Sequence, residues 1–238
     1  MSHVQPEASA AVFIVDDDDS LRKALTSLLE SVGFRVAAFA STSAFRAHAK
    51  ADVPSCLILD VRLKGESGLE FQQWAAANAL HMPIIFMTGY GDVEMSVRAM
   101  KSGAVNFLAK PFREQDMIEA VTEALERDAV RRKAQTLAST LREQFSTLTP
   151  RERDIAVLVA AGNMNKATAS QLELSEMTVK IYRARAMKKL AARTTAELVR
   201  KVRALQLEGA GAGRFEGRIE ARSDAKSEGE VDGAAWSP

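Results

Sequence analysis

The chain has 238 residues and a formal net charge of +1, which hides a strong asymmetry along the sequence. Residues 1–128 carry a net charge of −6, residues 129–148 carry +3, residues 149–207 carry +7 and residues 208–238 carry −3. We therefore expect an acidic first part and a basic second part with separate tasks, and a polyanion as partner of the basic part.

Composition also excludes several classes of protein. No apolar run approaches the roughly 20 residues that a transmembrane helix needs, and residues 1–10 lack the basic and apolar regions of a secretory signal. The single cysteine, Cys56, cannot form an internal disulfide and lies in an apolar run, so we expect a small buried side chain. These features predict a cytoplasmic protein with no membrane partner.

The first 128 residues alternate apolar runs with helical patterns. The apolar runs lie at residues 11–15, 34–39, 56–59, 83–87 and 104–108. Helical spacing of apolar residues fills the intervals at 21–33, 42–50, 69–78 and 93–103, and a further helix begins at Glu114. Short, fully apolar strands between helices are typical of a parallel sheet covered on both faces. We therefore predict an α/β fold with a doubly wound sheet of five parallel strands.

Four polar residues stand at or just after the carboxyl ends of these strands. They are Asp16, Asp60, Thr88 and Lys110, which are far apart in the sequence. Ligands of open parallel sheets bind at the carboxyl ends of the strands. The four side chains should therefore gather on one edge of the sheet.

The residue types at this edge favour phosphoryl transfer. Asp16, Asp17 and Asp60 would repel one another without a cation, and Mg²⁺ prefers oxygen ligands while keeping waters that a phosphoryl group can replace. Asp60 is the candidate nucleophile, because carboxylates form aspartyl phosphates. Lys110 and Mg²⁺ would neutralise charge on the phosphoryl oxygens, and Thr88 would donate a hydrogen bond to one of them.

The second part of the chain is helical throughout. Residues 114–148 form a long helical stretch with a charged middle, which is either a dimer seam or a solvated connector. Thr149, Pro150 and Glu152 form a capping box that begins the next helix. Further helices are expected at about 166–172, 175–191 and 195–207, and the Gly-, Ala- and Ser-rich residues 208–238 should be disordered.

The helix at 175–191 has the character of a recognition helix. Val179, Tyr182, Ala186 and Leu190 can face a core, which leaves a row of basic side chains for nucleic acid. Residues near the amino-terminal half of such a helix contact base edges, whereas more distant cations bind phosphates. The candidates for base edges are Met177, Lys180, Ile181 and Ala184. The candidates for phosphates are Arg183, Arg185, Lys188 and Lys189, and Thr178 belongs to the same predicted contact surface.

The motifs of residues 10–128 resemble the receiver domain of two-component systems, which has a flavodoxin-like fold. The similarity rests on Asp16-Asp17, on Asp60 with Ser67-Gly68, on Thr88-Gly89 and on Lys110-Pro111-Phe112. It implies that Asp16 and Asp17 hold Mg²⁺ and that Asp60 is phosphorylated and binds the ion. It also implies a metal ligand in the backbone carbonyl of Arg62, a switch role for Phe107 beside Thr88, and a cis Lys110–Pro111 bond. For Phe107, a plain core position is the alternative.

Residues 148–207 resemble the LuxR-type helix-turn-helix domain, on the stretch from Leu148-Thr149-Pro150 through Asn165-Lys166 and Thr178-Val179-Lys180 to Lys189-Leu190. Together with the receiver motifs, the whole chain resembles the NarL/FixJ family of response regulators, and Tyr182-Arg183-Ala184 indicates its FixJ branch. The expected organisation is a flexible N-terminus at 1–10, a receiver at 11–128, a helical linker at 129–147, the DNA-binding domain at 148–207 and a tail at 208–238. The resemblance implies a sensor histidine kinase, double-stranded DNA and RNA polymerase as partners. It also implies a homodimer on phosphorylation, through a receiver face at about 92–113 and the last helix.

Two departures and two alternatives remain. Lys64 stands where many receivers carry proline, and Glu173 stands at a turn position where glycine or aspartate is frequent. The chain could instead be a phosphohydrolase that uses Asp60, although Arg62 replaces the second acid that haloacid-dehalogenase-type enzymes carry. It could also regulate transcription without phosphorylation. We expect a DNA-binding regulator, not an enzyme, that catalyses only its own phosphoryl transfer and dephosphorylation.

Overall fold

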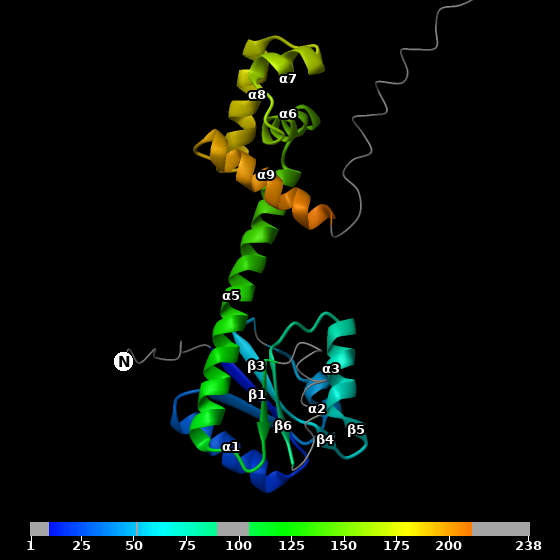
Figure 1. Cartoon of the computed structure of the whole chain (residues 1–238), viewed down its shortest axis with the longest axis vertical. Helices are drawn as coiled ribbons and strands as arrows, with labels where there is room; N and C mark the ends of the chain where they lie inside the picture. Colours follow the sequence, from blue (N-terminus) through cyan, green and yellow to red (C-terminus); the bar gives the residue numbers. More distant parts are fainter. Residues whose placement is uncertain (1–9, 51, 90–104, 211–238) are drawn as a thin grey trace, which may run out of the picture. The chain divides into compact units, whose positions relative to one another are not determined.

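The computed structural model describes residues 10–50, 52–89 and 105–210, with side chains up to Gln206 (Figure 1). The chain divides into two compact units, Met1–Gln135 and Thr136–Pro238. Within the described ranges, none of the helices is long and apolar enough to cross a membrane. The helix expected at 93–103 and the tail from residue 211 lie outside the described residues.

The first unit is built on a sheet of five parallel strands. The strands are β1 (Ala11–Val15), β2 (Arg35–Phe39), β3 (Ser55–Asp60), β6 (Ile84–Thr88) and β7 (Asn106–Ala109), in the spatial order β2-β1-β3-β6-β7. All four pairings are parallel. The predicted doubly wound α/β fold is therefore confirmed.

The described helices of this unit cover both faces of the sheet. They are α1 (Asp19–Ser31), α2 (Thr42–Ala47), α3 (Gly68–Ala77) and the first part of α5 (Glu114–Ser146), and Figure 1 shows α1 and α5 on the side opposite α2 and α3. Successive strand residues point to opposite faces, so Ile14 and Ile58 pack with α1 and α5. Phe13 and Leu57 pack with α2 and α3. Because both faces are buried, the central strands β1, β3 and β6 are apolar along their middle, and their polar residues lie at the strand ends.

Two helix ends in this unit follow from local contacts. Gly33 has a positive φ of 93° just after α1, a conformation that glycine adopts without strain and that commonly ends a helix. α2 ends at Ala47, three residues earlier than predicted. His48 is extended there, and its ring packs 5.1 Å from the ring of Phe39 and 5.9 Å from that of Phe13. These ring contacts stabilise the extended conformation of His48 and therefore the end of the helix at Ala47.

A short antiparallel hairpin follows β3, and the sequence did not predict it. β4 (Arg62–Leu63) pairs with β5 (Glu66–Ser67), and Gly65 between them has a φ of 88°. Ser67 then caps α3 through a capping box with Glu70. The hairpin carries the chain from the carboxyl end of β3 directly into α3.

Between the end of α5 and residue 210, the second unit contains four helices. They are α6 (Pro150–Ala160), α7 (Asn165–Leu172), α8 (Glu176–Lys189) and α9 (Thr195–Ala210), which extends three residues beyond the prediction. The capping box of Thr149 and Glu152 is present, and Ser175 caps α8 as expected. Val179, Ala186 and Leu190 are fully buried in one hydrophobic core with residues of α6, α7 and α9, and Tyr182 packs against it, which confirms the predicted inner face of α8.

The turn between α7 and α8 places Glu173 in the left-handed region, with φ 54° and ψ 45°. The N–H of the next residue, Leu174, donates to the carbonyl of Ala169 over 2.9 Å, as in a Schellman ending. This ending normally places glycine at the left-handed position, because a side chain there is strained. Glu173, at a turn position where glycine or aspartate is frequent, therefore does adopt the positive φ that strains a side chain.

Replacing this residue tests the strain directly. Glu173→Gly should raise the free energy of unfolding of the second unit by about 1 kcal/mol, because glycine adopts a positive φ without steric cost. Native-state hydrogen exchange at the buried amides of α6 and α8 in the full chain measures this change. Glu173→Ala is the matched control, since it keeps a Cβ atom and should give no such gain. Equal stability of both variants would contradict the assignment.

Candidate functional site

Two carboxylates stand side by side at the carboxyl edge of the sheet. Asp60 ends β3, Asp16 follows the neighbouring strand β1, and Asp16 is fully buried while Asp60 is 8% exposed. Asp16 Oδ1 accepts the N–H of Asp18 at 2.8 Å, and Asp60 Oδ1 accepts the N–H of Arg62 at 2.9 Å. These bonds leave the second oxygen of each carboxylate directed to other partners.

Lys110 supplies the positive charge between these carboxylates. Its Nζ lies 2.9 Å from Asp16 Oδ2 and 2.6 Å from Asp60 Oδ2. Burial alone would lower the pKa of Lys110, but the hydrogen bonds to Asp60 and Asp16 outweigh it, so this pKa is raised. Burial raises the pKa of Asp16, and Lys110 offsets this only in part. The lysine is therefore held as a cation at the strand ends.

Asp17 completes a set of three carboxylates that can hold a metal ion. One oxygen from each of Asp16, Asp17 and Asp60 lies within 4.8 Å of the others. Lys64, from the β4–β5 hairpin, lies 3.3 Å from Asp17 and is largely exposed. The next residue, Asp18, caps α1 by accepting the N–H groups of Ser20 and Leu21, so it belongs to the helix end. A set of hard oxygen donors beside open solvent suits a divalent cation such as Mg²⁺.

Thr88 and Phe107 lie on the next two strands. Thr88 ends β6, is 2% exposed, and donates its hydroxyl to the carbonyl of Gly89 at 3.2 Å. Its own carbonyl accepts the N–H of Lys110 at 2.6 Å, which joins the two strand ends. Phe107 is half-buried on β7, beside Phe86 and the core under α2 and α3. This position accommodates both expectations for Phe107, and the expected cis Lys110–Pro111 bond is present.

The structure gives Gly68 a role beside this site that the sequence did not predict. A Cβ atom on Gly68 would lie 2.4 Å from the carbonyl oxygen of Asp60. The N–H of Gly68 donates to the carbonyl of Val61 at 2.9 Å, so the start of α3 presses on the chain just after β3. Only glycine allows this approach, and the only sequence signal was a Ser-Gly pair that begins a helix.

A buried carboxylate, Asp128, was also missed, because it lies in a charged run that reads as a solvated helix. Its side chain is inaccessible and accepts the N–H of Ser55 at 3.0 Å. Arg131 and Arg132 pair with it at 2.7 and 2.6 Å, and Arg132 also pairs with Asp52. These contacts fix α5 to the start of β3. Cys56 lies beside them, fully buried as predicted, and burial with the nearby charge of Asp128 raises the pKa of its thiol.

In the second unit, the predicted DNA-contacting residues of α8 differ in how exposed they are. Met177, Lys180, Ile181, Ala184, Arg185 and Lys188 are exposed. Thr178 is half-buried and contributes to the cap, with its hydroxyl 2.8 Å from that of Ser175. Arg183 is also half-buried and donates to Asn165 Oδ1 at 3.1 Å. Lys189 differs from the expectation, because its Nζ contacts Glu152 at 2.6 Å and the carbonyl of Thr147 at 3.0 Å.

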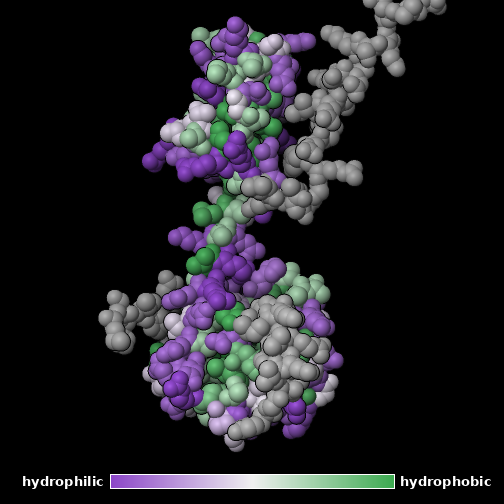
Figure 2. Space-filling model, in the orientation of Figure 1, coloured by the Kyte–Doolittle hydropathy of each residue, from purple (hydrophilic) through white to green (hydrophobic). Residues whose placement is uncertain are grey.

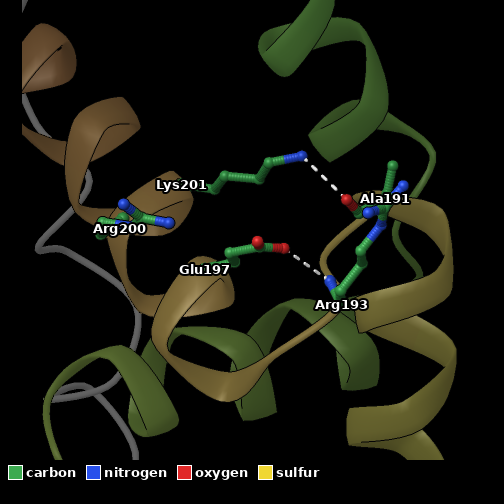
Figure 3. Close-up of a pocket in the computed structure, with 5 residues that line it drawn as sticks. All are labelled: Ala191, Arg193, Glu197, Arg200 and Lys201. Atoms are coloured by element: carbon green, nitrogen blue, oxygen red, sulfur yellow. Dashed lines mark hydrogen bonds between the residues drawn. The ribbon is translucent and has the colours of Figure 1, made fainter.

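A pocket of about 440 Å³ lies where α8 turns into α9 (Figure 3). Two of its polar side chains are used within the fold. Lys201 donates to the carbonyls of Leu190 and Ala191 at 2.6 and 3.2 Å, and Glu197 accepts the N–H of Arg193 at 2.7 Å. These bonds hold the turn between α8 and α9 together. The polar side chains of the pocket are therefore explained by the structure of that turn.

Comparison with known proteins follows the same division of the chain. Residues 12–122 match the family described as response regulator receiver domain, and residues 146–202 match bacterial regulatory proteins of the luxR family. Nodulation protein W of Bradyrhizobium diazoefficiens is 52% identical over 198 residues, which cover 83% of this chain and 87% of that protein.

The chain belongs to the NarL/FixJ family of response regulators. A second relative, the transcriptional regulatory protein FixJ of Azorhizobium caulinodans, is 40% identical over 195 residues, which cover 81% of this chain and 91% of that protein. The solved structure of the response regulator StyR is 43% identical, with a TM-score of 0.75 over 82% of this chain and 99% of that one.

As a response regulator, the chain joins a receiver to a LuxR-type DNA-binding domain and acts in transcription. These domains imply a histidine kinase partner and DNA binding. Receivers generally bind Mg²⁺ in an acidic pocket, and Asp16, Asp17 and Asp60 form an acidic cluster of that kind here.

The close approach at Gly68 gives a test of how the receiver loop is held. Gly68→Ala should destabilise the receiver by roughly 1–3 kcal/mol, because the added methyl group meets the backbone of Asp60. Thermal and urea unfolding of the full chain measure the loss. Gly89→Ala is the matched control, since a Cβ atom there meets nothing within 4 Å. Similar stability of both variants would show that the chain after β3 is not constrained by Gly68.

The pair of Glu152 and Lys189 predicts a pH dependence of the second unit. The hydrogen bond from Lys189 lowers the pKa of Glu152 below its ordinary value of 4.5. Its contribution to stability is therefore present above pH 4.5 and is lost as the pH falls through the lower folded pKa. Glu152→Gln should be less stable at neutral pH and should lose less stability on acidification, measured by urea unfolding across pH. Glu176→Gln, at an exposed acid of α8, should follow the wild type, and a parallel pH profile of Glu152→Gln would contradict the pairing.

Proposed function

We propose that a sensor histidine kinase phosphorylates this response regulator on Asp60, and that the modification promotes dimerisation and sequence-specific binding to double-stranded DNA. The observation that carries the proposal is the contact of Lys110 Nζ with Asp60 and Asp16 at 2.6 and 2.9 Å, beside the third carboxylate of Asp17. A nucleophilic carboxylate, a fixed ammonium and a carboxylate set for a divalent ion are the groups that phosphoryl transfer needs.

Each residue at the sheet edge then has a specific task. Asp16, Asp17, Asp60 and the backbone carbonyl of Arg62 would hold Mg²⁺, and the bound ion would neutralise charge on the phosphoryl oxygens. An oxygen of Asp60 attacks the phosphorus carried by the kinase histidine. As the new P–O bond forms, the P–N bond to that histidine breaks, and the imidazole leaves after taking up a proton from solvent. The transferred phosphoryl group displaces Lys110 from its present contact with the Asp60 carboxylate. Lys110 and the hydroxyl of Thr88 then bind phosphoryl oxygens, and Phe107 moves with Thr88 to report the new charge. The receiver's own catalysis is limited to this transfer and to the later hydrolysis.

The rest of the chain turns this event into DNA binding. The receiver comprises residues 11–128, the linker 129–147 and the DNA-binding domain 148–207, between an N-terminal segment at 1–10 and a tail at 208–238. The DNA-binding surface is formed by Met177, Thr178, Lys180, Ile181, Arg183, Ala184, Arg185 and Lys188. Two copies bind paired half-sites and contact RNA polymerase, with a receiver face at about 92–113 and α9 as dimer contacts. Most of that receiver face lies outside the described residues.

Removing the proposed nucleophile tests this function. Asp60→Asn should reduce phosphate incorporation from acetyl phosphate to background, because an amide cannot form the acyl phosphate. Incorporation into the full chain is measured with radiolabelled donor in the presence of Mg²⁺, and a chelator should suppress it in the wild type. Asp19→Asn is the control, since Asp19 is exposed on α1 and pairs with Arg22 and Lys23. Undiminished labelling of Asp60→Asn would refute the assignment, and sustained turnover of a phosphoester would favour a hydrolase.

A further inference from the structure

The outer face of α8 combines apolar and cationic side chains. Met177 is 65% exposed and Ile181 is 46% exposed, although both are large and hydrophobic. They lie four residues apart, so they are neighbours on the helix surface, and Ala184 continues the same stripe. On the face visible in Figure 2, hydrophobic patches lie among hydrophilic side chains of the second unit. The exposed stripe therefore needs an explanation other than core packing.

The fold itself does not use this stripe. Val179, Ala186 and Leu190 fill the inner side of α8, and the Ser175 cap fixes where the helix begins. Full burial of a side chain such as Met or Ile is worth roughly 1.5–3 kcal/mol, and only part of that gain is realised for Met177 and Ile181. A partner that covers Met177 and Ile181 would recover part of it.

The charges beside the stripe indicate what that partner is. Lys180 and Lys188 are exposed on the same side of the helix, at positions three and eleven residues after Met177. Arg185 is exposed as well, with its guanidinium 5.7 Å from the ring centre of Tyr182. An apolar stripe between cations is complementary to the major groove of DNA, where phosphates flank base edges and the methyl group of thymine is the apolar feature. An apolar surface of a protein partner would not need these cations.

We propose that Met177 and Ile181 contact the C5-methyl groups of thymines in the major groove and thereby determine part of the operator sequence. This inference rests on the proposed DNA binding and adds the chemical group that is recognised. An isoleucine side chain has no hydrogen-bonding atoms and a methionine has only a weak acceptor, so neither reads the donor and acceptor pattern of a base pair well. Their Cα atoms are about 6 Å apart along the helix, which allows them to contact thymines one or two base steps apart.

Removing single methyl groups from the DNA tests the proposal. Binding sites are first selected from random duplex DNA with the full phosphorylated chain. Each thymine of the enriched site is then replaced by deoxyuridine, which lacks only the C5-methyl group. At one or two positions in each half-site, this replacement should weaken binding roughly threefold to tenfold, as expected for the loss of one buried methyl group. Replacement at the remaining positions should have little effect.

Variants of the protein assign each methyl contact to a side chain. Met177→Ala and Ile181→Ala should each bind more weakly and should lose the deoxyuridine effect at one position, so that the two changes are not additive. Lys188→Ala is the matched control on the same helix. It should weaken binding to all duplexes and reduce the salt dependence, but it should keep the deoxyuridine effect.

The outcomes separate this inference from the function on which it rests. Enrichment of no sequence would refute sequence-specific DNA binding, and the inference with it. An enriched site that tolerates deoxyuridine at every position would refute methyl recognition alone. A deoxyuridine effect that persists at the same position in both variants would assign that methyl contact to another residue and would overturn the proposal. Unchanged DNA binding by both variants would leave the exposed stripe to a protein partner and would also overturn the proposal.

Discussion

The receiver depends on one electrostatic arrangement, in which the ammonium of Lys110 lies between the carboxylates of Asp16 and Asp60. A fully buried Asp16 beside a second carboxylate is costly unless a cation compensates it. The parallel register provides this compensation, because Asp16, Asp60 and Lys110 follow strands whose carboxyl ends lie at one edge. The same contact places the Asp60 carboxylate and the Lys110 ammonium beside Asp17, the third carboxylate of the set. The stability of this edge and its chemistry therefore share the same residues.

Much of this arrangement could be predicted from the sequence, because it follows from simple patterns. The central strands are apolar along their middle, which indicates a sheet with two covered faces, and the polar residues that end the strands must then converge. The caps at Thr149 and Ser175 and the left-handed Glu173 also follow from local rules. The Gly68 contact, the buried Asp128 and the β4–β5 hairpin depend on which segments meet in space. Lys189 shows the same limit, since a cation in a basic run looks free until Glu152 is placed beside it.

The two units use charge in opposite ways. In the receiver, acidic groups surround one lysine at the end of a buried sheet. In the DNA-binding domain, cations surround an apolar stripe on the outer face of α8. The family matches divide the chain in the same way, because residues 12–122 match the receiver family and residues 146–202 match the luxR family. Phosphates can be held by the cations, but a preference for one sequence over another requires contacts with base edges. Met177 and Ile181 are exposed and apolar, so the thymine methyl group is the feature of a base edge that they fit.

The central claim is that one carboxylate at the end of β3 accepts the phosphoryl group. The most direct measurement is to phosphorylate the full wild-type chain with acetyl phosphate and Mg²⁺, trap the acyl phosphate by borohydride reduction, and locate the modified residue by peptide mass spectrometry. We predict that the reduced residue is Asp60 alone. Modification of Asp16, Asp17 or any other carboxylate in its place would contradict the account.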